Sequence, residues 1–109
     1  MKLLIPTCGS HVAPRFDNAT EVLIATCYDR QLLEEPRFIL LANPSAEGLC
    51  DMILKEQVKC VVCCGIEEEH YRFLKWKKIT VIDSVIGRWK PALDLAVGGE
   101  LSAGDILRV

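Results

Sequence analysis

Residues 60–65 read Cys60-Val61-Val62-Cys63-Cys64-Gly65, and this stretch decides the fold class. A continuous apolar run without polar alternation is typical of a central parallel strand whose two faces are both covered. Gly65 ends the strand, and residues 66–77 then place their apolar side chains on one helical stripe. A buried strand that leads directly into an amphipathic helix predicts an α/β protein.

The flanking sequence adds four strands and two helices to this unit. We expect strands at Leu3–Thr7, Glu21–Tyr28, Arg37–Ala42, Cys60–Cys64 and Ile79–Ile82. Helical spacing predicts a helix from Asn43, as its cap, to Leu54, and another from Trp89 to Val97 that ends at two glycines. Polar residues 29–36 predict a loose hairpin turn, and residues 100–109 a loosely ordered tail.

The element order βββαβαβα shows no internal repeat or linker, so we expect one domain over residues 1–109. A right-handed crossover joins the last two strands, and helices on both faces of a mixed five-stranded sheet require the strand order 3-2-1-4-5. The chain direction reverses between the first and fourth strands. Ligands of open α/β sheets bind at such a reversal, so the loops after Thr7 and Cys64 should face one pocket.

Composition excludes several classes of partner. The chain has 109 residues, 26% of them charged, and a formal charge of -2, which offers no field for nucleic acid. No apolar run approaches the roughly 20 residues of a membrane helix, and Pro6 interrupts the apolar start too early for a signal peptide. We therefore expect a cytoplasmic protein with reduced thiols and no membrane partner.

Six cysteines invite a redox or zinc interpretation. The spacing Cys60-x-x-Cys63 matches a redox dithiol or half of a zinc site. Positions three apart on a strand point to opposite faces and lie roughly 10 Å apart, so this pair cannot bind one ion. Cys27 and Cys50 are interpreted as core residues.

The predicted pocket gathers sulfur and nitrogen donors. The candidate metal ligands are Cys8, His11, Cys64 and His70. Thiolate and imidazole suit soft and borderline metals, so these residues would form an open coordination site. Two alternatives stay open, because Cys64 also fits a buried structural thiol and His70 a packed histidine on an apolar helix face.

A wider set of residues at the same crevice would hold a cofactor. The candidate cofactor-binding residues are Cys8, Ser10, His11, Arg15, Cys64 and Gly65. Arg15 follows a rigid proline, and its planar guanidinium offers a donor fork to oxo or sulfido groups. The alternative for Arg15 is an ordinary surface charge.

Three motifs carry a family likeness: Val12-Ala13-Pro14-Arg15-Phe16 after the Met-Lys-hydrophobic-Pro-Thr opening, Val61-Val62-Cys63-Cys64-Gly65-Ile66, and Gly98-Gly99-Glu100-Leu101. Together they resemble the dinitrogenase iron-molybdenum cofactor biosynthesis family, which includes NifX, the NafY core, the C-terminal part of NifB and the orange protein. The resemblance implies a three-layer ribonuclease H-like fold. It also implies non-catalytic binding or transfer of an iron-sulfur or molybdenum-containing cluster, with donor or acceptor proteins as partners.

Two departures from the family motif leave a second hypothesis open. Cys64 stands where the family usually carries glycine, and Glu67 where it often does. The chain would then be a regulatory or protein-interaction module that has lost the cluster, and a thiol switch through Cys63 or Cys64 is a third possibility. We expect no enzyme, because two-metal phosphoryl chemistry needs clustered carboxylates and the central strands carry none.

Overall fold

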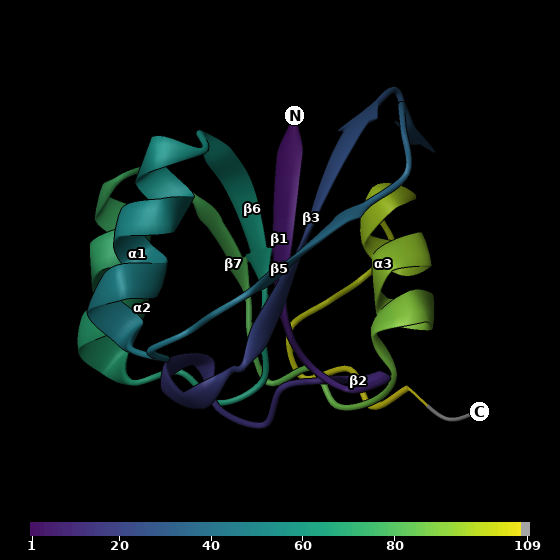
Figure 1. Cartoon of the computed structure of the whole chain (residues 1–109). Coiled ribbons are helices and arrows are strands. Elements are labelled where there is room, and N and C mark those ends of the chain that lie inside the picture. Colours follow the sequence, from purple (N-terminus) through teal and green to yellow (C-terminus); the bar gives the residue numbers. More distant parts are fainter. Residues whose placement is uncertain (108–109) are drawn as a thin grey trace.

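The computed structural model describes residues 1–107 and shows three layers, with a mixed sheet between α1 and α2 on one face and α3 on the other (Figure 1). The strands are β1 (Lys2–Cys8), β2 (His11–Val12), β3 (Glu21–Tyr28), β4 (Gln31–Leu32), β5 (Arg37–Leu40), β6 (Val58–Val62) and β7 (Thr80–Ile82). The helices are α1 (Ala46–Lys55), α2 (Glu68–Trp76), α3 (Trp89–Val97) and the short 3-10 helix η1 (Phe16–Asn18). The expected mixed α/β class is confirmed.

β1 is the central strand, and its residues 3–7 are fully buried. It pairs antiparallel with β3 and parallel with β6, which in turn pairs parallel with β7. On its other side β3 pairs with β5 along residues 21–24 and with β4 at residues 27–28. The sheet has seven strands, because the short strands β2 and β4 add to the five that the sequence predicts.

The two additional strands, β2 and β4, each form a tight hairpin in a region where the sequence predicts a loop. Asp29 and Arg30 connect β3 to β4 with φ angles of 51° and 65°. Two successive left-handed residues make the type I′ turn that matches the twist of paired strands. The expected loose turn over residues 29–36 is therefore wrong. The tight turn was not predicted because Asp29 and Arg30 are not glycines, the residue type that usually signals such a turn.

α1 begins later than expected. Ser45 is extended, with φ of -157°, and its Oγ accepts a hydrogen bond from the Gly48 amide at 3.0 Å. Ser45 thus satisfies an otherwise unpaired amide of the first helical turn, and Asn43 and Pro44 lie before the helix. The expected cap at Asn43 is therefore wrong, and the helix begins after Ser45.

β6 starts at Val58 and ends at Val62, two residues earlier than expected at each end. Cys63 and Cys64 lie beyond the strand, where their carbonyls accept hydrogen bonds from the amides of Val85 at 3.1 Å and Ser84 at 2.9 Å. The loop after β7 therefore extends the contact of β6 with its neighbour. The run of cysteines continues the apolar pattern without continuing the strand.

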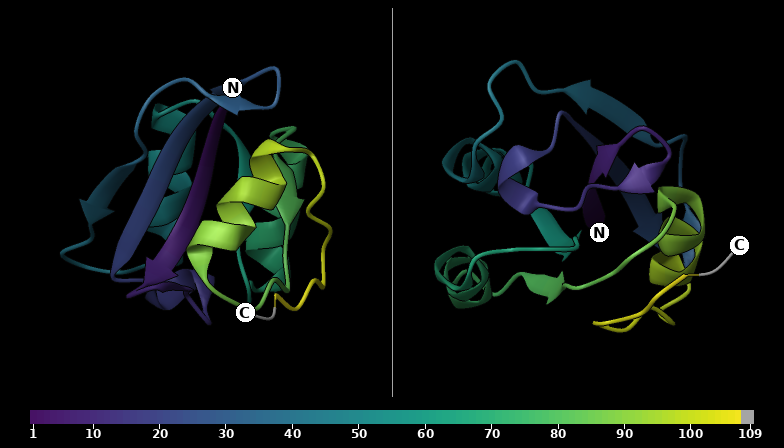
Figure 2. Two further views of the ribbon diagram at one scale, coloured as in Figure 1. Left: turned by 90° about the vertical axis from the view of Figure 1, so that its right-hand side faces the viewer. Right: turned by 90° about the horizontal axis from the view of Figure 1, so that it is seen from below.

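The expected tail also differs, because residues 100–107 pack against the domain (Figure 2). Leu101 is buried under α3, and the Leu107 amide donates a hydrogen bond to the Ile86 carbonyl at 2.7 Å. Ile106 forms a parallel bridge with Ile86. The apolar side chains of Leu101 and Leu107 account for this packing. The expected tail also includes residues 108–109, which lie outside the described part of the chain.

Two buried clusters fill the space on either side of the sheet. Cys60 packs beneath α3, whereas Cys63 packs beneath α1 and α2, as strand geometry predicts. Burial raises the pKa of the Cys60 thiol to about 11 and that of Cys63 to about 12. Both groups are thus neutral thiols on opposite faces, which fits neither a redox dithiol nor half of a zinc site.

Among the described residues, no helix is both long and apolar enough to cross a membrane.

Candidate functional site

The segment between β2 and η1 and the loop after β6 meet at the carboxyl edge of the sheet. The Gly65 amide donates to the Pro14 carbonyl at 2.9 Å, and the Phe16 amide donates to the Gly65 carbonyl at 2.7 Å. A Cβ at Gly65 would lie 2.8 Å from the Pro14 oxygen, so glycine permits this approach. A hollow of about 330 Å³ at this contact is lined by Arg15 from the first segment, by Asp17 of η1, and by Gly65, Ile66 and Glu67 from the second. Of the expected pocket residues, the lining described within residues 1–107 includes Arg15 and Gly65 but not Cys8, Ser10, His11 or Cys64.

Cys8 and His11 form a tight hairpin rather than part of a long loop. The two residues are direct cross-strand partners of β1 and β2, and both are exposed. Directly opposed side chains lie on the same face, with Cβ atoms about 4.5–5.5 Å apart. Gly9 turns the chain with φ of 61°, and the Ser10 hydroxyl lies 3.2 Å from His11 Nδ1. A thiol and an imidazole therefore stand side by side at the surface.

The hairpin is anchored to the start of α3. The Val12 amide donates to the Gly87 carbonyl at 2.9 Å, and the Trp89 amide donates to the Ser10 carbonyl at 3.1 Å. His11 also forms an antiparallel bridge with Arg88, the residue that precedes α3. The backbone of Arg88 and the positive end of the α3 dipole thus lie next to His11. The positive end of the α3 dipole favours an anionic group at this position.

Cys64 shares a cluster with Val12, the neighbour of His11 in β2, but within residues 1–107 the donor atoms of Cys8, His11 and Cys64 do not form a group within 4.8 Å. The Cys64 side chain is half-buried and packs against the cluster beneath α3, to which Val12 also belongs. The thiol is therefore neither a fully exposed ligand nor a fully buried core residue, and both interpretations made from the sequence stay open.

Arg15 faces the hollow between the two loops and is held by Asp17. Its Nε and one terminal nitrogen donate to the two Asp17 carboxylate oxygens at 3.0 and 2.9 Å. This hydrogen bonding lowers the pKa of Asp17. Since a guanidinium has five N–H donors, Arg15 retains others for an anion.

The structure places His70 away from Cys8 and His11. His70 belongs to α2, and its ring stacks on Phe16 of η1 with centroids 6.3 Å apart. Seen from below, the chain after β2 crosses under the sheet from the α3 layer to η1 beside α1, which separates the two positions (Figure 2). Within residues 1–107, the one group of three metal-ligating side chains whose donor atoms lie within 4.8 Å is Glu67, Glu69 and His70.

Sequence reasoning therefore missed Arg88 and the two glutamates as site residues. Nothing in the sequence signals the bridge of Arg88 to His11. For the glutamates a detectable signal was present, because Glu67 and His70 are three residues apart and have the spacing of Glu-x-x-His.

No family model and no curated protein matches the chain. Solved structures do. PH0822 has a TM-score of 0.83 and 18% identity, with 94% of each chain covered. A "putative dinitrogenase" from Methanocaldococcus jannaschii has a TM-score of 0.75 and 26% identity, covering 94% of this chain and 92% of that one. A "putative NifB protein" from Thermotoga, of the DUF35 family, has a TM-score of 0.70 and 19% identity, covering 98% and 97%. The mixed α/β fold of this chain is thus shared by these proteins over nearly their whole length.

Proposed function

We propose that this chain binds, stores or transfers an iron-molybdenum-type or other soft-metal-sulfur cluster without catalysing a reaction on it. The proposal includes the ribonuclease H-like fold and membership of the dinitrogenase iron-molybdenum cofactor biosynthesis family. Two neighbours carry names connected with nitrogenase, one of them at 26% identity over 94% of this chain. The observation that carries the proposal is the exposed Cys8–His11 pair at the end of the central strand.

The chemistry of the pair suits a metal-sulfur cargo. A thiolate is a soft donor and an imidazole a borderline one. Both therefore bind the iron or molybdenum of a metal-sulfur cluster more readily than they bind hard cations such as Mg²⁺. Cross-strand pairing orders both residues before the cargo arrives, so little backbone entropy is lost on binding. Because both side chains are exposed, a second protein can approach the same cluster.

Two protein donors are fewer than a metal-sulfur cluster usually has, and such incomplete coordination suits a protein that passes the cluster on. The remaining coordination positions stay available to a protein that donates or accepts the cargo. The positive end of the α3 dipole lies next to His11 and favours an anionic cluster there. Cys64 would become a third donor only if its loop moved, because among the described residues its thiol does not form a group within 4.8 Å with the donors of Cys8 and His11. His70 has no role in this cargo site, because it lies beside α1 and α2.

One observation favours the second hypothesis, an interaction module without cargo. The hollow between the loops is lined by Arg15, Gly65 and Ile66, but also by the carboxylates of Asp17 and Glu67. Carboxylates at this point repel an anionic cluster. In the carrier model, the cargo therefore lies at the hairpin rather than in the hollow.

Anaerobic cluster uptake distinguishes the two functions. Apoprotein is mixed with a synthetic [4Fe-4S] cluster under argon, desalted, and measured by visible absorption and metal analysis. The carrier model predicts uptake that falls at least about tenfold in Cys8→Ser and His11→Ala. Cys27→Ala, which removes a buried thiol, is the matched control and should keep uptake. A wild-type protein that takes up no cluster, or variants equal to wild type, would contradict the carrier model.

A further inference from the structure

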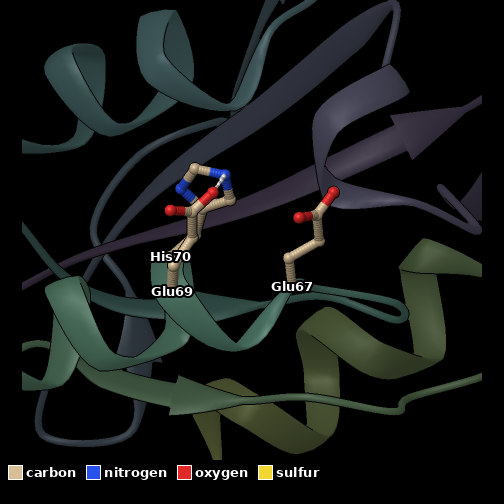
Figure 3. Close-up of side chains that lie close together, drawn as sticks. All are labelled: Glu67, Glu69 and His70. Carbon is tan, nitrogen blue, oxygen red and sulfur yellow. Dashed lines mark ion pairs between the residues drawn. The ribbon is translucent and has the colours of Figure 1, made fainter.

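Glu67, Glu69 and His70 form a second donor group at the start of α2 (Figure 3). One donor atom from each residue lies within 4.8 Å of the others. Glu67 is the extended residue that precedes α2, and Glu69 and His70 lie in the first turn of the helix. Helix bundles bind iron and manganese with Glu-x-x-His on one helix, and the same residue types and spacing occur here with the glutamate just before the helix.

The imidazole of His70 is held in place by packing. Its side chain is 14% exposed, and the ring lies against Phe16 at an interplanar angle of 29°. Its Nε2 lies 3.6 Å from Glu69 Oε1, which is too long for a hydrogen bond. An ion between these atoms would draw both toward itself with little rearrangement of the ring.

Charge around His70 favours a cation. The same hollow, about 310 Å³ in volume, is also lined by Glu47 of α1 and Asp17 of η1. Asp17 is already neutralised by Arg15. Glu47, Glu67 and Glu69 remain, so three carboxylates surround one imidazole. This field attracts a metal ion and repels an anionic cluster.

We propose that Glu67, Glu69 and His70 bind a divalent transition-metal cation of the Mn²⁺, Fe²⁺, Co²⁺ or Zn²⁺ class. Carboxylates with one imidazole suit these ions, whereas Cu⁺ prefers sulfur and Ca²⁺ prefers oxygen alone. The site uses no residue of the Cys8–His11 pair and does not depend on the proposed cargo function. In this proposal His70 remains a metal ligand, as expected from the sequence, but it binds a single metal ion together with Glu67 and Glu69 instead of a cluster together with Cys8 and His11.

Cobalt is the probe that tests this site. Co²⁺ is titrated into full-length apoprotein under reducing, anaerobic conditions, and binding is followed by visible d–d absorption and calorimetry. Glu67→Gln, Glu69→Gln and His70→Gln should each weaken binding at least about tenfold. Glu68→Gln is the matched control, because Glu68 shares the first turn of α2 but pairs with Arg72 instead. Circular dichroism verifies that each variant is folded.

The outcomes separate this site from the hairpin. Nitrogen-oxygen ligation gives weak d–d bands without sulfur-to-cobalt charge transfer, and those bands should persist in Cys8→Ser. The proposal is overturned if wild-type protein fails to bind Co²⁺ at millimolar concentration, or if Glu68→Gln weakens binding as much as the other variants. Binding with a charge-transfer band that Cys8→Ser abolishes would also overturn it and would place the ion at the hairpin.

Discussion

Gly65→Ala tests the contact that brings the two loops of the carboxyl edge together. The new Cβ would lie 2.8 Å from the Pro14 carbonyl oxygen, a backbone atom that cannot rotate away. If the loops separate, two backbone hydrogen bonds are lost, at about 1 kcal/mol each. If they stay together, the strain costs about 1–3 kcal/mol. Either route predicts a loss of about 2 kcal/mol in the free energy of unfolding.

Urea unfolding followed by circular dichroism measures this loss. Gly98→Ala is the control, because its Cβ would meet the flexible Glu100 carboxylate at 3.3 Å in ordinary helical backbone. The control should stay within about 0.5 kcal/mol of wild type. Cys8 should keep its wild-type rate of labelling, since the hairpin is anchored separately through Gly87 and Trp89. A Gly65→Ala variant as stable as wild type would refute the reasoning.

Three further predictions concern stability and reactivity. Ser45→Ala should lower the free energy of unfolding by about 1 kcal/mol in urea titrations, and Ser45→Asp should restore it. An aromatic disulfide reagent at pH 8 should modify the exposed Cys8 quickly. Burial raises the pKa of Cys63 to about 12, so this thiol should react only when the protein unfolds. Rapid modification of Cys63 in folded protein would be inconsistent with its burial. Hydrogen bonding from Arg37 lowers the pKa of Glu56. Its stabilising effect is therefore complete above the unfolded pKa of about 4.3 and lost as pH falls through the folded value, so Glu56→Gln should flatten this acid limb of a stability-pH curve.

Much of the architecture follows from local patterns in the sequence. The unbroken run at residues 60–62 identified a buried strand, and apolar spacing identified all three helices. The glycines at 98 and 99 marked the end of α3 correctly. These features depend on which face of an element is apolar, and side-chain pattern reports that directly.

The errors arise where backbone geometry or distant contacts decide. Asp29 and Arg30 adopt left-handed conformations that their residue types do not announce. Leu101 is buried because α3 lies over it, which no local pattern reveals. Periodicity likewise placed His70 on an apolar stripe but could not show that η1 supplies the stacking partner, Phe16.

The candidate site divides for the same reason. The residues that hydrogen-bond with Gly65 are Pro14 and Phe16, which follow β2, and not the turn between Cys8 and His11 that directly follows β1. The layer in which each donor lies depends on the path of the chain between β2 and η1, which crosses under the sheet (Figure 2). Sequence therefore nominated the donors Cys8, His11 and His70 without showing that His70 stacks on Phe16 of η1 instead of joining the Cys8–His11 pair.

The central claim is that the Cys8–His11 pair carries the metal-sulfur cargo, and pulsed electron paramagnetic resonance tests it most directly. The chain has two histidines, His11 and His70, so ¹⁵N-histidine labelling leaves only two possible sources of imidazole coupling. In reduced, cluster-loaded protein we predict coupling from one imidazole nitrogen that disappears in His11→Ala and persists in His70→Gln. Absence of imidazole coupling, or coupling that disappears with His70 instead, would contradict the account.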